Sequence, residues 1–179
     1  MACLWWALLL LCLPLKWLLA CAAAAATHEM GHAVAVFLTG GNIRSVRIGM
    51  AGAIIKGDCS TYGREIVCSL AGPLCSLHCL IWLRVFPWFA FCGLIQGIYN
   101  LLPLYPLDGG RALLGILRKV CSRDPYPIFL WIQIIIFGIL AAVCIFACFR
   151  FRLGISALFP LLPALFGKTP CKDENLRLQ

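Results

Sequence analysis

The sequence predicts an all-α polytopic membrane protein with about six transmembrane helices and one small β-hairpin-like insertion. Of its 179 residues, 63% are hydrophobic and only 12% are charged, whereas a soluble domain of this size carries about a quarter charged residues. The mean hydropathy is +0.95. Apolar runs recur along the chain, several of them close to the roughly 20 residues that a helix needs to cross a bilayer.

These apolar runs predict six helices, of which the two outermost are short for a bilayer. We expect helices near residues 2–15, 17–39, 65–83, 87–105, 128–149 and 153–167. The segments 2–15 and 153–167 are shorter than roughly 20 residues, and the second contains Pro160 and Pro163, which break helices. Four spans remain if these two do not cross, and the sequence leaves both counts open.

The helix at 17–39 is followed by a segment of different character. Its run from Cys21 to Ala26 is almost all alanine, a strong helix former whose small side chain lets helices approach closely in lipid. Gly40-Gly41 then ends the helix. Residues 42–58 are typical of two short extended pieces with glycine at the bend. Such a hairpin would either add a strand to an unwound substrate or serve only as a connection.

Prolines interrupt two of the inner spans. Pro73 is expected to kink the helix at 65–83. The next span runs into Pro103, Pro106 and a glycine pair, where a regular helix cannot continue. Irregular backbone at membrane depth is tolerated only where it is buried in protein or lines a cavity. Asp108 lies on this irregular stretch.

The net charge of +8 is explained by membrane topology, so we expect no nucleic-acid partner. With six spans, eleven of the fifteen Lys and Arg residues lie on one side of the membrane and four on the other. The positive-inside rule places the larger set, and with it both termini, in the cytoplasm. The larger set comprises Arg44, Arg47, Lys56, Arg64, Arg111, Arg118, Lys119, Arg123, Lys168, Lys172 and Arg177, and the smaller set comprises Lys16, Arg84, Arg150 and Arg152.

The twelve cysteines do not indicate a disulfide scaffold. Most of them lie inside apolar runs, where a free thiol behaves as a small hydrophobic side chain. The sequence contains no Cys-x-x-Cys pair, which argues against a thiolate zinc site. We therefore interpret the cysteines as packing residues.

Two histidines and one distant aspartate predict a metal site within the membrane. His28 and His32 are four residues apart, so their side chains leave one face of a helix and can hold one zinc ion. A catalytic zinc needs a third protein ligand and an open position. Asp108 is the other acid at membrane depth besides Glu29, and a buried carboxylate is costly unless a cation compensates it. We expect one Zn²⁺ per chain, bound by His28, His32 and Asp108.

Two further residues would complete a hydrolytic site. Glu29 can reach a water on the zinc ion, whose pKa falls towards about 7, and can carry its proton to the leaving nitrogen. Asn100 is the candidate donor to the developing oxyanion. The alternatives are a chance histidine pair, an Asp108 that only caps or pairs with Arg111, and an Asn100 that only bonds another helix. We interpret His78 as a structural hydrogen-bonding histidine.

Together these motifs resemble the site-2 protease family of intramembrane zinc metalloproteases. The resemblance covers about residues 17–120. It is closest to the bacterial sporulation stage IV protease branch, which shares the motif Pro-Leu-Asp-Gly-Gly and has no inserted PDZ domain. Many relatives carry asparagine at the position of Ser76. The residues that carry the resemblance are His28-Glu29-Met30-Gly31-His32, Ala71-Gly72-Pro73 and Asn100-Leu-Leu-Pro-Leu-Tyr-Pro-Leu-Asp108-Gly-Gly-Arg111.

The resemblance implies regulated intramembrane proteolysis, the cleavage of a membrane-associated protein within or beside its membrane segment. His28, His32 and Asp108 match the family's zinc ligands. Glu29 matches its catalytic base, and Asn100 matches its oxyanion-stabilising asparagine. The site would face the cytoplasm from a multi-pass protein of the cell membrane. The implied partners are a membrane-tethered substrate such as a pro-sigma or anti-sigma factor, the lipid bilayer, and a regulatory membrane protein or a second copy of the chain.

The same reading predicts one transmembrane metalloprotease domain at 1–167, with its core at 17–120 and a cytoplasmic tail at 168–179, and no PDZ or CBS domain. Two other functions are alternatives to a protease. A non-catalytic membrane scaffold or chaperone is disfavoured because the metal ligands and the base are all present. A metal transporter is disfavoured because transporters favour repeated halves, and neither motif has a second copy.

Overall fold

The computed structural model describes residues 14–40, 43–49, 52–57, 61–121 and 124–151. The helices expected at 2–15 and 153–167 and the tail at 168–179 lie outside the described residues, as does the end of the expected domain. In chain order, the elements are α2 (Leu15–Leu38), β1 (Ile43–Gly49), β2 (Gly52–Gly57), α3 (Tyr62–His78), the 3-10 helix η1 (Cys79–Trp82), α4 (Pro87–Leu101), α5 (Asp108–Val120) and α6 (Tyr126–Phe151).

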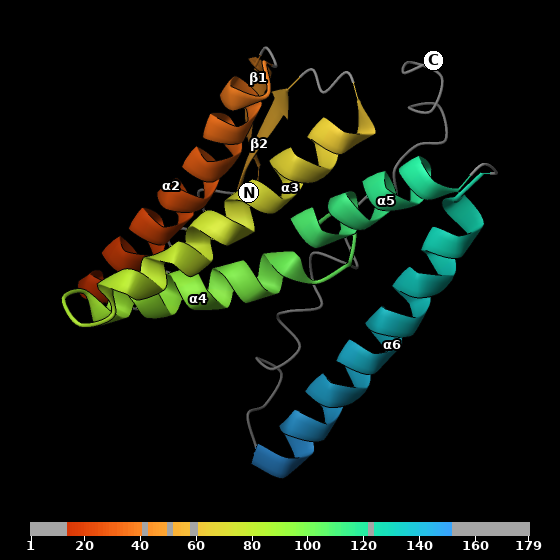
Figure 1. The fold of residues 1–179 in the computed structure, drawn as a ribbon. Coiled ribbons are helices and arrows are strands. Elements are labelled where there is room, and N and C mark those ends of the chain that lie inside the picture. Colours follow the sequence, from red (N-terminus) through yellow and green to blue (C-terminus); the bar gives the residue numbers. More distant parts are fainter. Residues whose placement is uncertain (1–13, 41–42, 50–51, 58–60, 122–123, 152–179) are drawn as a thin grey trace.

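Helices α2, α3 and α4 pack side by side as a bundle, α5 packs against α3, and α6 extends away from the bundle after α5 (Figure 1). The four helices expected at 17–39, 65–83, 87–105 and 128–149 are all present. Only α4 differs much, since it ends at Leu101. The cause is Pro103, which disfavours helical geometry at the residue before it, and Leu102 accordingly has φ −56° and ψ 129°.

The sequence failed to predict α5. Residues after Asp108 were expected to continue the irregular stretch because a glycine pair usually interrupts a helix. Instead Asp108 is the first residue of a 13-residue helix, where a carboxylate interacts favourably with the positive end of the helix dipole. Only residues 102–107 are non-helical between α4 and α5. This correction matters because it places the carboxylate of Asp108 at a fixed helix end.

Small residues bring α2 and α3 into close contact. Ala20, Ala24 and Ala35 of α2 are buried. A side chain at Gly31 would lie 2.7 Å from the carbonyl oxygen of Ala71 on α3, so the two backbones meet almost directly. Close packing of this kind drives helix association in lipid, because lipid tails are as apolar as the side chains and the hydrophobic effect does not favour helix–helix contact.

The segment that the sequence predicted as a hairpin forms two antiparallel strands. β1 pairs with β2, with Gly49 opposite Gly52 at the bend and an irregularity in register between Ile43 and Ser45. The pair follows α2 directly and contacts it. Addition of a substrate strand at this hairpin stays a prediction.

The described cysteines are all free. Cys68, Cys79, Cys92 and Cys144 are buried, in keeping with the interpretation as packing residues. Cys21 is exposed, and its Sγ lies 3.2 Å from that of Cys92.

Two segments among the described residues are long and apolar enough to cross a membrane. They are Tyr62–Trp82, which combines α3 with η1, and Tyr126–Arg150 in α6. Large apolar side chains on α6 are exposed, including Trp131 and Phe146, as expected for a helix that faces lipid. The number of spans, six or four, stays a prediction.

A candidate metal centre between three helices

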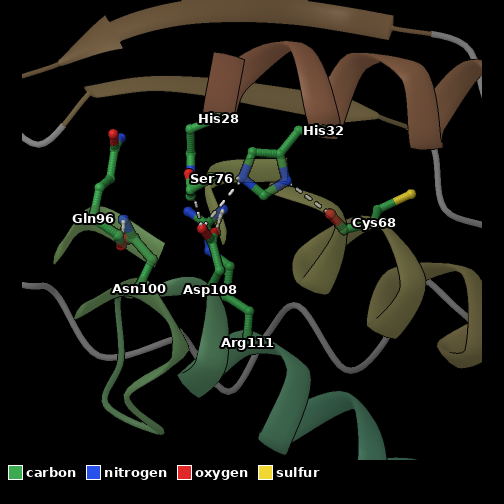
Figure 2. A network of polar contacts seen from close by, with 8 residues as sticks. All are labelled: His28, His32, Cys68, Ser76, Gln96, Asn100, Asp108 and Arg111. Atoms are coloured by element: carbon green, nitrogen blue, oxygen red, sulfur yellow. Dashed lines mark hydrogen bonds and ion pairs between the residues drawn. The ribbon is translucent and has the colours of Figure 1, made fainter. Parts of the chain in front are cut away.

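Three side chains from distant parts of the chain converge at one point. The Oδ2 atom of Asp108 lies 3.0 Å from Nε2 of His28 and 3.2 Å from Nε2 of His32, and the two Nε2 atoms are 3.2 Å apart (Figure 2). His28 and Asp108 are only 3% and 7% exposed. The three residues that the sequence predicted as metal ligands are therefore neighbours in the structure.

The local fold explains how these side chains meet. His28 and His32 lie one turn apart on α2, on the face that packs against α3. Asp108 begins α5, which also packs against α3. Gly109 and Gly110 make this approach possible, because a side chain at Gly109 would overlap the carbonyl of Leu101. The glycine pair thus lets α5 begin directly against the end of α4.

The outer nitrogens of both imidazoles have hydrogen-bond partners on α3. Nδ1 of His32 lies 2.7 Å from the backbone carbonyl of Cys68, and Nδ1 of His28 lies 2.8 Å from the hydroxyl of Ser76. A carbonyl can only accept, so Nδ1 of His32 donates, and the neutral ring has its lone pair on Nε2. Metal-binding histidines typically have such partners, which fix the tautomer and the ring orientation.

The three converging atoms fit a metal ion. A carboxylate oxygen and imidazole lone pairs at 3.0–3.2 Å from one another repel each other unless a cation or a proton lies between them. Two ligands of a tetrahedral zinc ion are about 3.3 Å apart, given zinc–nitrogen bonds of about 2.0–2.1 Å. Among the residues that the structure describes, this is the cluster of three or more His, Cys, Asp or Glu side chains able to hold a metal.

The alternative role of Asp108, an ion pair with Arg111, involves only one of the two carboxylate oxygens. Oδ1 lies 3.8 Å from Nη1 of Arg111, one turn further along α5. This ion pair is long and involves an arginine that is partly exposed, so it contributes little. The other oxygen faces the two histidines. Asp108 therefore does more than pair with Arg111.

The two residues expected to act on substrate, Glu29 and Asn100, lie on α2 and α4. Glu29 follows His28 on α2 and is half-buried. Asn100 is on the last turn of α4, where its Nδ2 donates to the carbonyl of Gln96 at 3.0 Å. That bond engages one N–H group of the amide, and the oxyanion role stays a prediction. His78 is exposed at the C-terminal end of α3, and its structural role also stays a prediction.

The hydrogen-bond partners of the two histidines could not be predicted from the sequence. Ser76 was noted only as a departure from the asparagine of many relatives, yet it is fully buried and contacts His28. Ser69 and Ser76 are both serines of α3, and nothing in their spacing indicates which of them contacts a histidine. The contact of His32 is with a backbone carbonyl, which no side-chain pattern can reveal.

Replacing Ser76 with alanine should weaken zinc binding by about 10-fold, the lower end of the effect of losing a partner to a metal ligand. The loss of the hydroxyl leaves Nδ1 of His28 without its partner at 2.8 Å, and the ring is then free to turn. Chelator competition on the purified protein measures the affinity. Ser69→Ala, which removes another buried hydroxyl of α3, is the matched control. An unchanged affinity in Ser76→Ala would show that helix packing alone orients the ring.

Comparison with known proteins identifies the family. A family model described as Peptidase M50B-like matches residues 1–104, more than half of the chain. The chain belongs to the M50 peptidase family. A second model, Peptidase family M50, matches residues 62–147. The two M50 matches together include both histidines and Asp108.

Individual M50 relatives are distant and longer. Rip3 of Mycobacterium tuberculosis is 30% identical over 111 residues, which are 51% of this chain and 28% of that protein. Zinc metalloprotease MJ0392 of Methanocaldococcus jannaschii is 29% identical over 106 residues, 51% of this chain and 31% of the relative. The chain thus spans less than a third of the length of these relatives.

A solved structure shares the fold. The site-2 protease from Methanocaldococcus jannaschii matches with a TM-score of 0.59 at 22% identity, over 86% of this chain and 78% of that chain. The expected site-2 protease likeness is therefore confirmed at the level of the family and the fold. With its two segments able to cross a membrane, this M50 member is a membrane protein. Membership in the sporulation branch stays a prediction.

Proposed function

We propose that this chain is a zinc-dependent intramembrane endopeptidase, which hydrolyses a peptide bond in or near a membrane segment of a protein substrate. The observation that carries the proposal is the convergence of Nε2 of His28, Nε2 of His32 and Oδ2 of Asp108 within 3.2 Å. Membership in the M50 family supports it, and relatives named as zinc metalloproteases make zinc the metal we assign.

Each residue would have a separate role. His28, His32 and Asp108 would hold one Zn²⁺, which when bound polarises a carbonyl oxygen and makes a water more acidic. Glu29 accepts a proton from the attacking water and delivers it to the nitrogen as the C–N bond breaks. The amide of Asn100 donates to the carbonyl oxygen while negative charge builds there.

We also assign the site to the cytoplasmic side of a multi-pass protein in the cell membrane. The helix that begins with Asp108 continues into Arg111, Arg118 and Lys119, so positive charge follows the site directly. The N-terminal ends of α2 and α4 carry aromatic rings, with the ring centroids of Trp17 and Trp88 4.4 Å apart, and a single lysine, Lys16, whose Nζ lies 5.0 Å from the centroid of the Trp88 ring. Basic residues favour the cytoplasmic side, and tryptophans favour the membrane interfaces. The substrate would be a membrane-tethered protein such as a pro-sigma or anti-sigma factor.

Metal analysis of the purified protein tests this proposal through Asp108→Ala. We expect the wild-type chain to bind about one zinc, and the variant to bind at least about 100-fold more weakly, since losing a ligand exceeds the 10–100-fold effect of losing a ligand's partner. Asp124→Ala removes an exposed carboxylate just before α6 and is the matched control. Equal zinc content in Asp108→Ala and wild type would remove Asp108 from the ligand set. A wild-type chain that binds no zinc would overturn the proposed function.

A further inference from the structure

Gln133 is a polar residue in an otherwise apolar helix. Between Pro127 and Phe149 it is the one residue whose side chain carries an amide, a hydroxyl or a charge. Burying an amide in lipid or protein is costly unless its hydrogen bonds are made internally. The position of Gln133 in α6 therefore requires an explanation beyond packing.

Both ends of the Gln133 amide bond the backbone of the loop at 102–107, which joins α4 to α5. Its Oε1 accepts the N–H of Tyr105 at 2.7 Å, and its Nε2 donates to the carbonyl of Pro103, also at 2.7 Å. Both bonds are short, one with the amide as acceptor and one with it as donor, so the side chain binds two nearby peptide groups at once. A residue on α6 thus holds the loop that leads to Asp108.

The backbone of this loop needs that external partner. Its two prolines supply no N–H group. The N–H groups of Leu104 and Leu107 donate to carbonyls within the loop, at 2.7 and 2.8 Å. The N–H of Tyr105 donates to Gln133 instead. An unpaired N–H at membrane depth costs several kcal/mol, so the loop in this conformation depends on Gln133.

Helix α5 also packs against this peptide group. A side chain at Gly110 would lie 2.5 Å from the backbone nitrogen of Tyr105, so α5 packs directly against that peptide group. Leu104 and Leu107 are both buried. The loop therefore contacts both Gln133 and the first turn of α5, and Asp108 follows it immediately.

We propose that Gln133 is a positioning residue for the metal centre. By fixing the backbone at 103–105, it sets where the loop delivers Oδ2 of Asp108 relative to the two histidines. This inference rests on the proposed zinc site. The contacts of 3.0 and 3.2 Å made by Oδ2 leave little tolerance, since a ligand displaced by about 1 Å no longer fits the metal. Helix α6 is thereby coupled to the site through one side chain.

Zinc affinity and the visible spectrum of the cobalt-substituted protein test the proposal on the full chain in detergent. Gln133→Met keeps the length and volume of the side chain but loses both hydrogen bonds. We expect it to bind zinc at least about 10-fold more weakly and to change the cobalt spectrum, which reports ligand geometry. A glutamate buried at this position is held in its protonated form, so Gln133→Glu can accept the N–H of Tyr105 and donate its O–H to the carbonyl of Pro103, and we expect affinity within about threefold of wild type.

Ile134→Ala, at the exposed neighbouring position of α6, is the matched control and should leave affinity and spectrum unchanged. An affinity of Gln133→Met within about twofold of wild type would overturn the positioning role while the zinc site stands. An equal loss in Ile134→Ala would overturn it too, because any change in α6 would then suffice. If Gln133→Met does not fold, Gln133→Asn, one methylene shorter, is judged by the same thresholds. A wild-type chain without zinc affinity refutes the metal site itself.

Discussion

Replacing Glu29 with glutamine is expected to abolish peptide hydrolysis while the zinc content stays at the wild-type level. Glutamine has nearly the same shape but cannot accept the proton from the attacking water. A positioned general base contributes about 10²–10⁴-fold to the rate, enough to bring cleavage below detection. The carboxylate of Glu29 is not among the three atoms that converge between the helices, so its loss should not release the metal. Co-expression with a membrane-tethered pro-sigma factor measures cleavage, and metal analysis measures zinc.

A matched variant separates loss of the base from loss of a negative charge. Glu65, at the start of α3, lies 3.8 Å from Arg118 and has no role in the proposed reaction. Glu65→Gln should therefore cleave at the wild-type rate. Cleavage by Glu29→Gln at that same rate would show that another group takes the proton. A loss of zinc in Glu29→Gln would instead make Glu29 a ligand.

The sequence was sufficient to predict that His28, His32 and Asp108 come together, because helix spacing and burial cost each indicate part of the cluster. The spacing of His28 and His32 matches one helical turn, and the two side chains do leave the same face of α2. Asp108 was found by elimination, as a carboxylate at membrane depth that needs a cation. Both arguments depend on burial cost and helix geometry. The four inner helices were predictable for the same reason, since long apolar runs carry their own signal.

The sequence was not sufficient where a feature depends on distant contacts. The glycines after Asp108 indicated a break in the helix, but the structure uses them for close approach to the backbone of Leu101 and Leu104. The partners of the imidazoles on α3 belong to a helix some 40 residues away, and no spacing rule connects them. Gln133 did carry a signal that could have been used, because an isolated amide in an apolar helix needs a partner.

Gly72→Ala should disrupt the metal centre without removing any ligand. A β-carbon at position 72 would lie 2.8 Å from Cδ2 of the His32 ring and closer still to Nε2, far inside normal contact distance. The ring cannot simply retreat, because Nδ1 is held at 2.7 Å by the carbonyl of Cys68. Either that bond breaks or α2 and α3 separate, and both displace the ligand. We expect zinc affinity to fall by at least about 100-fold, as for a lost ligand.

Gly63→Ala is the matched control for this prediction, because it makes the same change in the same helix, where among the described residues no side chain or backbone beyond the local helical turn lies within 4 Å of the added carbon. It should keep the zinc affinity of the wild type and raise the stability of α3 by up to about 1 kcal/mol, since alanine favours the helix more than glycine does. Chelator competition and thermal unfolding measure the two quantities. If Gly72→Ala bound zinc as tightly as Gly63→Ala, the His32 ring could not occupy the space above Gly72. The contact between α2 and α3 that brings the three ligands together would then be wrong.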